Sequence, residues 1–189
     1  MTLAAPPSLD QARRINIVQG EYRVERDPDV VLCTILGSCV AACLWDPAAA
    51  VGGMNHFLLP GQSSVRPGSG TAQRYGAYAM ELLINDLLRH GARRERLKAK
   101  LFGGACLVKG LTDIGRLNAE FAEQFLNAES IEVVGGSLRG ERGRRIQFSP
   151  ATGRARQTLL AADQPAVLRA EPDLRTFKAP PSSGAVELF

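Results

Sequence analysis

Hydrophobic positions follow one another closely in the first half of this chain, with few polar residues between them. Continuous apolar runs at 30–36 and 39–46 predict two buried strands, separated by a break at Gly37-Ser38. A third run, at 51–60, ends at a proline. Further along, the pattern predicts strands at 97–108, 131–138, 144–149 and 155–162. The chain is therefore expected to be rich in short strands.

Two other segments have the period of a helix. Positions i, i+3, i+4, i+7 and i+8 are apolar in the first one, and this stripe consists of Met80, Leu83, Ile84, Leu87 and Leu88. The second helix is predicted from about Asn118, as its N-cap, to Ala128. The order of three strands, helix, strand, helix and three strands predicts an α+β fold. We expect a single layered domain in which two main helices cover mixed sheets.

Composition sets the domain boundaries and the environment. With 189 residues, 45% hydrophobic and 22% charged, the chain is expected to form one domain at 16–168, after an N-terminal tail at 1–15. Residues 169–189 are rich in proline and serine and are predicted to be a disordered tail. The start lacks a signal-peptide pattern, and no apolar run reaches 18 residues. We therefore expect a cytoplasmic protein that does not insert into a membrane and keeps its four cysteines reduced.

The formal charge of +4 is concentrated in two basic segments, 89–100 and 139–145. Neither segment interleaves aromatic side chains with its basic ones, so nucleic-acid binding is not favoured. In the first segment, Arg93, Arg94 and Arg96 are instead predicted to form a docking face for an acidic protein. The alternative is that both segments are simply solvated surface.

Cys39 and His56 lie in consecutive predicted strands. If Asp46 pairs with Val51 across a short loop, the antiparallel register places His56 opposite Ala41. Cys39 then lies two positions along on the same face, at a distance that an imidazole can bridge. The sequence therefore permits a thiol–imidazole pair.

Such a pair suits nucleophilic catalysis, because the imidazole can take the proton of the thiol. The backbone N–H groups of Gly37, Ser38 and Cys39 would then form an oxyanion site. One alternative is that Cys39 is only a small buried side chain. The other is a zinc site that combines Cys33, Cys39, Cys43 and His56, but their spacing lacks the short cysteine knuckle of zinc sites, so no metal is predicted.

Five blocks of this sequence, in their order and spacing, resemble the CheD family of bacterial chemotaxis. They are LGSCVAACLWDP, GGMNHFLLP, AKLFGGACL, DIGRLN and GGSLRGERGRRIQFSPATGRA, and the resemblance spans about residues 16–165. It implies hydrolysis of selected glutamine side-chain amides to glutamate on the cytoplasmic helical domain of chemoreceptors, without a cofactor. It also implies a layered α/β/β fold similar to the catalytic domain of glutamine-deamidating toxins, and CheC as a further partner.

Carried over by position, the nucleophile of the family falls on Cys39 and its histidine on His56. The third family residue is a threonine six positions before the nucleophile, where this chain has Cys33 with Thr34 beside it. We predict Thr34 as the third member, since a hydroxyl accepts an imidazole N–H better than a thiol does, and Cys33 is the alternative. A rival function is a non-catalytic adaptor that binds CheC or receptors.

Overall fold

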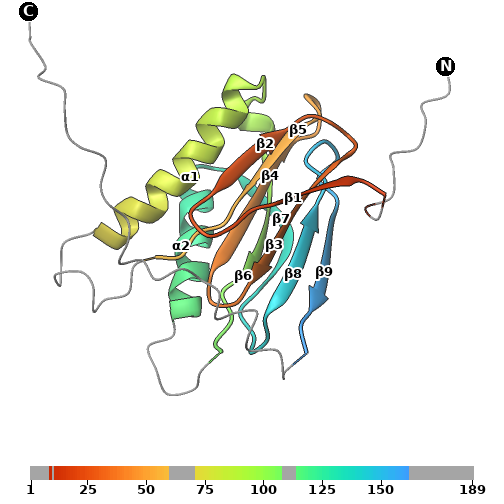
Figure 1. Cartoon of the computed structure of the whole chain (residues 1–189). Coiled ribbons are helices and arrows are strands. Elements are labelled where there is room, and N and C mark those ends of the chain that lie inside the picture. The colour runs from red at the N-terminus through yellow and green to blue at the C-terminus, as the bar shows by residue number, and fades with distance from the viewer. Residues whose placement is uncertain (1–8, 10, 60–70, 108–113, 162–189) are drawn as a thin grey trace, which may run out of the picture.

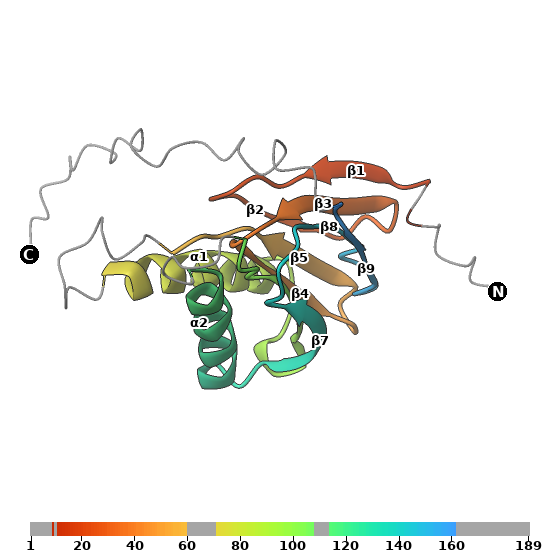
Figure 2. The same cartoon turned by 90° about the horizontal axis from the view of Figure 1, so that it is seen from below.

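The computed structural model describes residues 9, 11–59, 71–107 and 114–161. Two β-sheets stack on one another, and two helices cover the outer face of one of them, which gives three layers (Figures 1 and 2). The first sheet contains, in spatial order, β1 (Arg13–Asn16), β3 (Val30–Leu36), β8 (Arg144–Phe148) and β9 (Ala155–Leu159). The second contains β2 (Tyr22–Glu25), β5 (Val51–Asn55), β4 (Val40–Asp46), β6 (Lys98–Gly103) and β7 (Glu132–Leu138).

The helices are α1 (Thr71–Arg89) and α2 (Ile114–Ala128), and a 3₁₀ turn spans Arg94–Arg96. Both sheets are mixed, because β1 runs parallel to β3 and β6 parallel to β7, whereas the other pairs are antiparallel. The prediction of a single α+β domain with α/β/β layers is therefore confirmed. Within the described part of the chain, neither helix combines the length and the hydropathy needed to cross a membrane.

Alternation along β4 separates two hydrophobic cores. Ala42 and Leu44 face the helices, whereas Ala41, Cys43 and Trp45 face the first sheet. The side chains of one strand therefore contribute to both layers. Ala41, Cys43 and Trp45 thus lie between the two sheets, and this inter-sheet layer contains the candidate site.

Several expectations need correction. The sequence pattern missed β1 and β2, and β1 begins at Arg13, within the segment expected to be a tail. The assignment of Asn118 as a helix cap was wrong, because α2 begins at Ile114 and Asn118 is fully buried in its second turn. The strand expected over 51–60 ends as regular strand at Asn55. The predicted C-terminal tail at 169–189 lies outside the described residues.

Candidate active site

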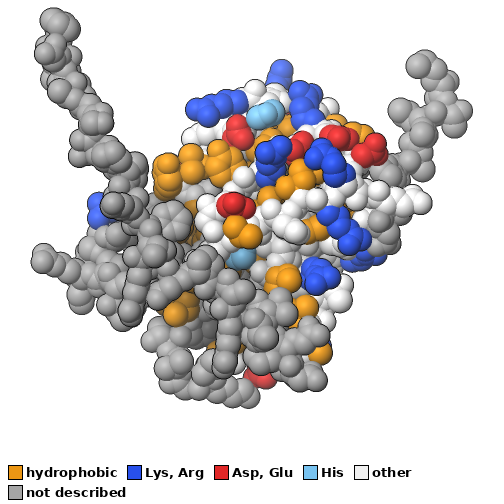
Figure 3. Space-filling view, viewed as in Figure 1, with side chains coloured by type: hydrophobic (Ala, Val, Ile, Leu, Met, Phe, Trp, Pro, Cys, Tyr) orange, Lys and Arg blue, Asp and Glu red, His pale blue; other side chains and the backbone are white. Residues whose placement is uncertain are grey.

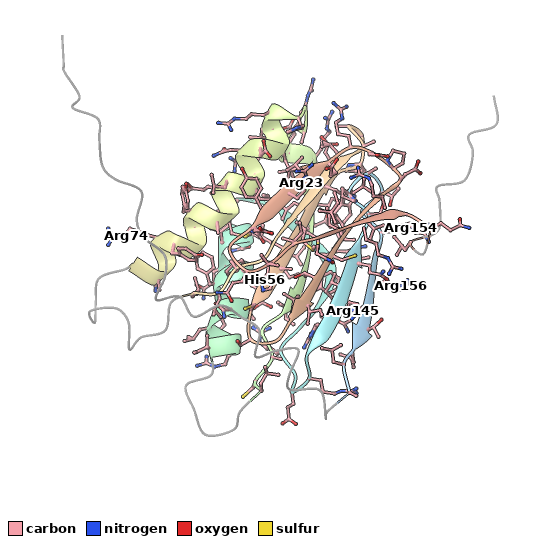
Figure 4. All side chains as sticks on the ribbon, viewed as in Figure 1. Arg23, His56, Arg74, Arg145, Arg154 and Arg156 are labelled. Carbon is pink, nitrogen blue, oxygen red and sulfur yellow. The ribbon has the colours of Figure 1, made fainter. Side chains whose placement is uncertain are left out.

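The β4–β5 hairpin has the register expected from the sequence. Asp46 pairs with Val51, and an isolated bridge between Val40 and Phe57 continues the same register beyond the end of β5. His56 therefore lies opposite Ala41, and it is seen at the end of these strands in Figure 4. The register inferred for this hairpin is therefore confirmed.

Thr34 reaches His56 from the other sheet. Its hydroxyl donates a hydrogen bond to the carbonyl oxygen of Ile17 at 2.8 Å and lies 2.9 Å from Nδ1 of His56. Because the only hydroxyl proton is used on Ile17, the hydroxyl oxygen must accept from Nδ1–H. Nδ1 of His56 therefore carries the proton, and Nε2 keeps its lone pair.

Cys33 lies on the opposite face of β3. Burial raises the pKa of its thiol, and its surroundings include Arg14, Arg145 and Gln147, which lie away from His56 on the outer face of the first sheet. The β3–β8 register runs without a shift from Leu32 to Leu36. The structure therefore brings Thr34 to His56 and leaves Cys33 outside the site. No bulge in β3 is needed for this arrangement, because the paired part of the strand is regular.

The turn before Cys39 is fixed through its carbonyl groups. The donors and acceptors are Ala105 N–H to Gly37 O at 2.8 Å, Asn118 Nδ2 to Ser38 O at 3.0 Å, and Gly104 N–H to Cys39 O at 2.7 Å. Gly103 has a positive φ of 110°, and a Cβ at this position would collide with the carbonyl oxygen of Cys39. In a trans peptide the N–H points away from the preceding C=O, so the N–H groups of Ser38 and Cys39 point away from these anchors.

Asn118 connects the segments that carry Cys39 and His56. Its Oδ1 accepts a hydrogen bond from the backbone N–H of Leu59 at 2.8 Å, while its Nδ2 donates to Ser38 O at 3.0 Å. One fully buried amide thus ties the chain after His56 to the turn before Cys39. The sequence did contain a signal, because position 118 lies on the same helical face as Phe121 and Phe125, and a polar group buried there needs partners.

His56 is almost completely buried, and this burial lowers its pKa from the ordinary value of 6.5 to about 4. The imidazole is therefore neutral near pH 7. Its Nε2 is buried and has no hydrogen-bond partner among the described residues. Buried polar groups without a hydrogen-bond partner are rare in folded proteins. A role as a proton acceptor would explain this one, because the lone pair of Nε2 is available to take a proton.

Cys39 is fully buried in this structure, with an exposed fraction of 0%. Its thiol donates a hydrogen bond to Oε1 of Gln19 at 3.5 Å. Tyr75 of α1 lies within electrostatic reach, since burial and then the charge of Cys39 raise the pKa of this phenol. Sequence analysis missed both neighbours. The core thiol of Cys43, by contrast, has a pKa raised by complete burial and is unreactive in this state.

The three arginines predicted to form a docking face lie at the other end of β4. The backbone N–H of Arg93 and the side chain of Arg96 both bind the carboxylate of Asp46, and Arg94 pairs with Glu129. Asp46 ends a strand of seven residues that begins next to Cys39, so these arginines lie roughly 20 Å from the thiol. The structure does not bring them to the site.

Metal ligands do not cluster in the part of the chain that the structure describes, where no group of three His, Cys, Asp or Glu could hold an ion. None of the four cysteines, all of which lie within the described residues, forms a disulfide. The candidate site therefore consists of Cys39, His56 and Thr34, with Gln19 and Asn118 beside them.

Comparison with known proteins supports one family. A family model described as CheD chemotactic sensory transduction matches residues 58–158. A protein of Acidiphilium cryptum named "Probable chemoreceptor glutamine deamidase CheD" is 81% identical over the whole of both chains. A protein of the same name from Caulobacter vibrioides is 53% identical over 95% of each chain.

The solved structure of the Bacillus licheniformis hypothetical protein YfiH is less similar. The match covers 61% of this chain and 49% of that protein, at 14% identity and a TM-score of 0.39, and this score is too low to support an argument. By its family model and its relatives, the chain belongs to the CheD family.

Proposed function

We propose that this protein hydrolyses specific glutamine side-chain amides of chemoreceptors to glutamate and releases ammonia. The observation that carries the proposal is the hydrogen bond from His56 Nδ1 to the Thr34 hydroxyl, which leaves Nε2 as a base in the same layer as Cys39. The substrate class comes from the names of the close relatives. Thr34, rather than Cys33, is proposed as the third member of the triad.

The first half of the reaction forms a thioester. Cys39 gives its proton to Nε2 of His56, and the thiolate attacks the amide carbon of the substrate. The N–H groups of Ser38 and Cys39 donate to the oxygen that becomes negative, because hydrogen bonds hold the preceding carbonyl groups, those of Gly37 and Ser38, in the opposite direction. His56 Nε2–H then protonates the amide nitrogen, the C–N bond breaks, and ammonia leaves.

The second half consumes one water molecule. His56 takes a proton from this water, the resulting hydroxide attacks the thioester carbon, and the C–S bond breaks. The products are a glutamate side chain and the regenerated thiol, so amide plus water gives acid plus ammonia. None of these steps calls on a cofactor. Throughout the cycle, Thr34 holds Nδ1–H, so the ring stays in the tautomer and orientation that both steps require.

Recognition of a folded receptor is proposed to use the basic surface. The four strands of the first sheet contain no acidic residue, and three of their five arginines, Arg14, Arg145 and Arg156, are exposed on its outer face, whereas Arg144 is buried. Arg145 and Arg156 lie on the β8–β9 flank in Figure 4, and Figure 3 shows basic side chains gathered on this part of the face. Opposite charge steers and orients an acidic helical surface of the receptor. Arg93, Arg94 and Arg96 remain a proposed second contact, now at the far end of an elongated substrate.

Two further proposals follow from the family rather than from the described contacts. They are a cytoplasmic location and binding of CheC. A purely non-catalytic adaptor is a weaker proposal, because an adaptor would not need a buried imidazole whose tautomer is fixed by a second sheet. The oriented His56 beside a thiol therefore favours the enzyme.

The decisive experiment is mass spectrometry of a receptor co-expressed with this protein. Conversion of an amide to an acid adds about 1 Da at each modified glutamine, as the thioester mechanism requires. Cys39→Ala should abolish the gain and keep the fold, because an alanine fits the buried site of the thiol. Cys39→Ser should be nearly inactive too, since a hydroxyl ionises far less readily. Wild-type deamidation in Cys39→Ala would refute the assignment of the nucleophile.

A further inference from the structure

A glutamine of the protein itself touches the thiol of this glutamine deamidase. Gln19 presents Oε1 to the thiol of Cys39 at 3.5 Å. Cys39 is fully buried, whereas Gln19, which accepts a hydrogen bond from its thiol, is only half-buried and reaches solvent. A substrate amide entering from solvent must reach the same sulfur atom. Gln19 therefore competes for that position.

The turn that carries Gln19 is fixed in place. Gly20 N–H donates to the carbonyl oxygen of His56 at 2.8 Å, and His56 N–H donates to Glu21 O at 3.0 Å. The side-chain carboxylate of Glu21 also accepts from the N–H of Val18 at 3.1 Å. Because the backbone on both sides of Gln19 is bonded, its side chain can leave the thiol by rotating about its own bonds while the turn stays in place.

The contact also separates the two catalytic groups. The thiol donates its proton to Gln19, and the lone pair of His56 Nε2 has no partner among the described residues. A productive site would instead have the proton of the thiol directed at Nε2. The structure therefore shows the pair in a resting arrangement, with the sulfur engaged elsewhere.

We propose that Gln19 is an internal stand-in for the substrate. Its side-chain amide occupies the subsite for the substrate amide and holds the Cys39 thiol until a receptor glutamine displaces it. The chemical match is close, because the two side chains are identical up to the backbone. This inference rests on the proposed deamidase function and adds to it a residue that regulates access to the nucleophile.

The stand-in is not itself consumed. A hydrogen bond to a carbonyl oxygen lies near the plane of the amide, where the lone pairs are. A nucleophile must approach the carbonyl carbon from above that plane. The thiol of Cys39 donates to Oε1 of Gln19, which is the first of these two approaches. The contact therefore occupies the subsite without leading to reaction.

The proposal is tested by alkylation of Cys39 with iodoacetamide at pH 7, with the modified cysteine identified by peptide mass. Gln19→Ala should react about fivefold faster, the factor expected if the open state of the wild type is populated about one fifth of the time. Gln19→Glu should react more slowly than the wild type, because a carboxylate beside the sulfur disfavours the thiolate. Val18→Ala, in the same turn but with an exposed side chain, should match the wild type.

The labelling of Cys43 and the KM for a receptor fragment serve as two further measurements. Cys43 is fully buried, so faster labelling of Cys39 alone supports removal of a cover, whereas equal acceleration at Cys43 reports general opening and contradicts the proposal. Alkylation needs no receptor, so this assay stays informative even if the proposed receptor substrate is wrong. With a receptor fragment, Gln19→Ala should lower KM about fivefold at unchanged kcat.

Three results would overturn the inference. The first is an unchanged alkylation rate in Gln19→Ala. The second is a higher KM in that variant, which would make Gln19 a residue that binds the substrate amide. The third is a glutamate at position 19 in purified wild-type protein but not in Cys39→Ala, which would make Gln19 a substrate of the enzyme.

Discussion

Replacing Thr34 with valine removes one oxygen atom and almost nothing else, and it tests how the imidazole is held. The hydroxyl links Ile17 O at 2.8 Å and His56 Nδ1 at 2.9 Å, and all three groups are buried. Each neutral hydrogen bond contributes about 1 kcal/mol net, and a buried group left without a partner costs about 1–3 kcal/mol. Because Ile17 O also acts on His56, the two orphaned groups can partly satisfy each other. We therefore expect a loss of about 1–3 kcal/mol in the free energy of unfolding.

The same substitution should also lower the rate of catalysis. Without the hydroxyl, Nδ1–H keeps only the carbonyl oxygen of Ile17 as an acceptor, so the imidazole ring is held less firmly in the orientation that catalysis requires. We expect kcat to fall about tenfold or more, which corresponds to about 1.4 kcal/mol of lost transition-state stabilisation, with KM little changed. The assay is deamidation of a receptor fragment, followed by ammonia release, together with urea unfolding of each variant.

Two controls accompany this variant. Thr34→Ser keeps the hydroxyl and should retain most of the activity, while Cys33→Ser alters the outer face of β3 and should change kcat little. The opposite pattern would refute the reasoning. If Thr34→Val retained the wild-type kcat while Cys33→Ser or Cys33→Thr changed it, then position 33 would be the third member of the triad.

The remaining predictions concern pH, positioning and docking. Burial holds the pKa of His56 at about 4 against 6.5 when unfolded, so the unfolded state binds the proton first as pH falls, and the free energy of unfolding should drop by about 2–3 kcal/mol between pH 7.5 and 4.5. Urea titrations should show this drop in the wild type and a smaller one in His56→Gln. Asn118→Leu should lower kcat about tenfold at similar KM, because Ser38 O loses its anchor, and Asn118→Asp should retain the bond from Leu59 but not the bond to Ser38. Reversing Arg145 and Arg156 to glutamate should raise KM and weaken its salt dependence while kcat stays constant, and a change in kcat alone would count against docking there. Arg94→Glu tests the distant arginines in the same assay.

The hairpin that carries Cys39 and His56 could be predicted because its register is a local property. A loop of four residues joins Asp46 to Val51, and such a short connection leaves few ways to pair the strands. Once that pair is fixed, the two-residue period of a strand determines which side chains share a face. The placement of Cys39 and His56 on the same face of the hairpin follows from these two facts.

The face of β3 could not be predicted in the same way. All of its residues except Thr34 are apolar, so both faces look equally suited to burial. Which side of the strand meets His56 depends on pairing with β8, more than a hundred residues later in the chain. The choice between Cys33 and Thr34 therefore rested on hydrogen-bond chemistry alone, and the structure brings Thr34 to His56.

The missed residues share a physical reason. Gln19 lies in a turn between two strands of only four residues each, which are too short to give a clear period. Its contact with Cys39 and the contacts of Asn118 with Ser38 join segments far apart in the sequence. Contacts of this kind arise from the stacking of layers, which no local pattern encodes.

Division of the site between two sheets gives the turn at 17–21 a special position. The thiol and the imidazole belong to the second sheet, whereas the hydroxyl that orients the imidazole belongs to the first. The turn is bonded to both, since Ile17 N–H donates to Cys33 O in β3 and Gly20 N–H donates to the carbonyl oxygen of His56. The same five residues supply the acceptor for Thr34 and the amide that accepts a hydrogen bond from the Cys39 thiol. Any movement that shifts this turn away from His56 must therefore uncover the thiol and loosen the base together. For this reason we expect displacement of Gln19 by rotation of its side chain, since this route opens the site and leaves the base in place.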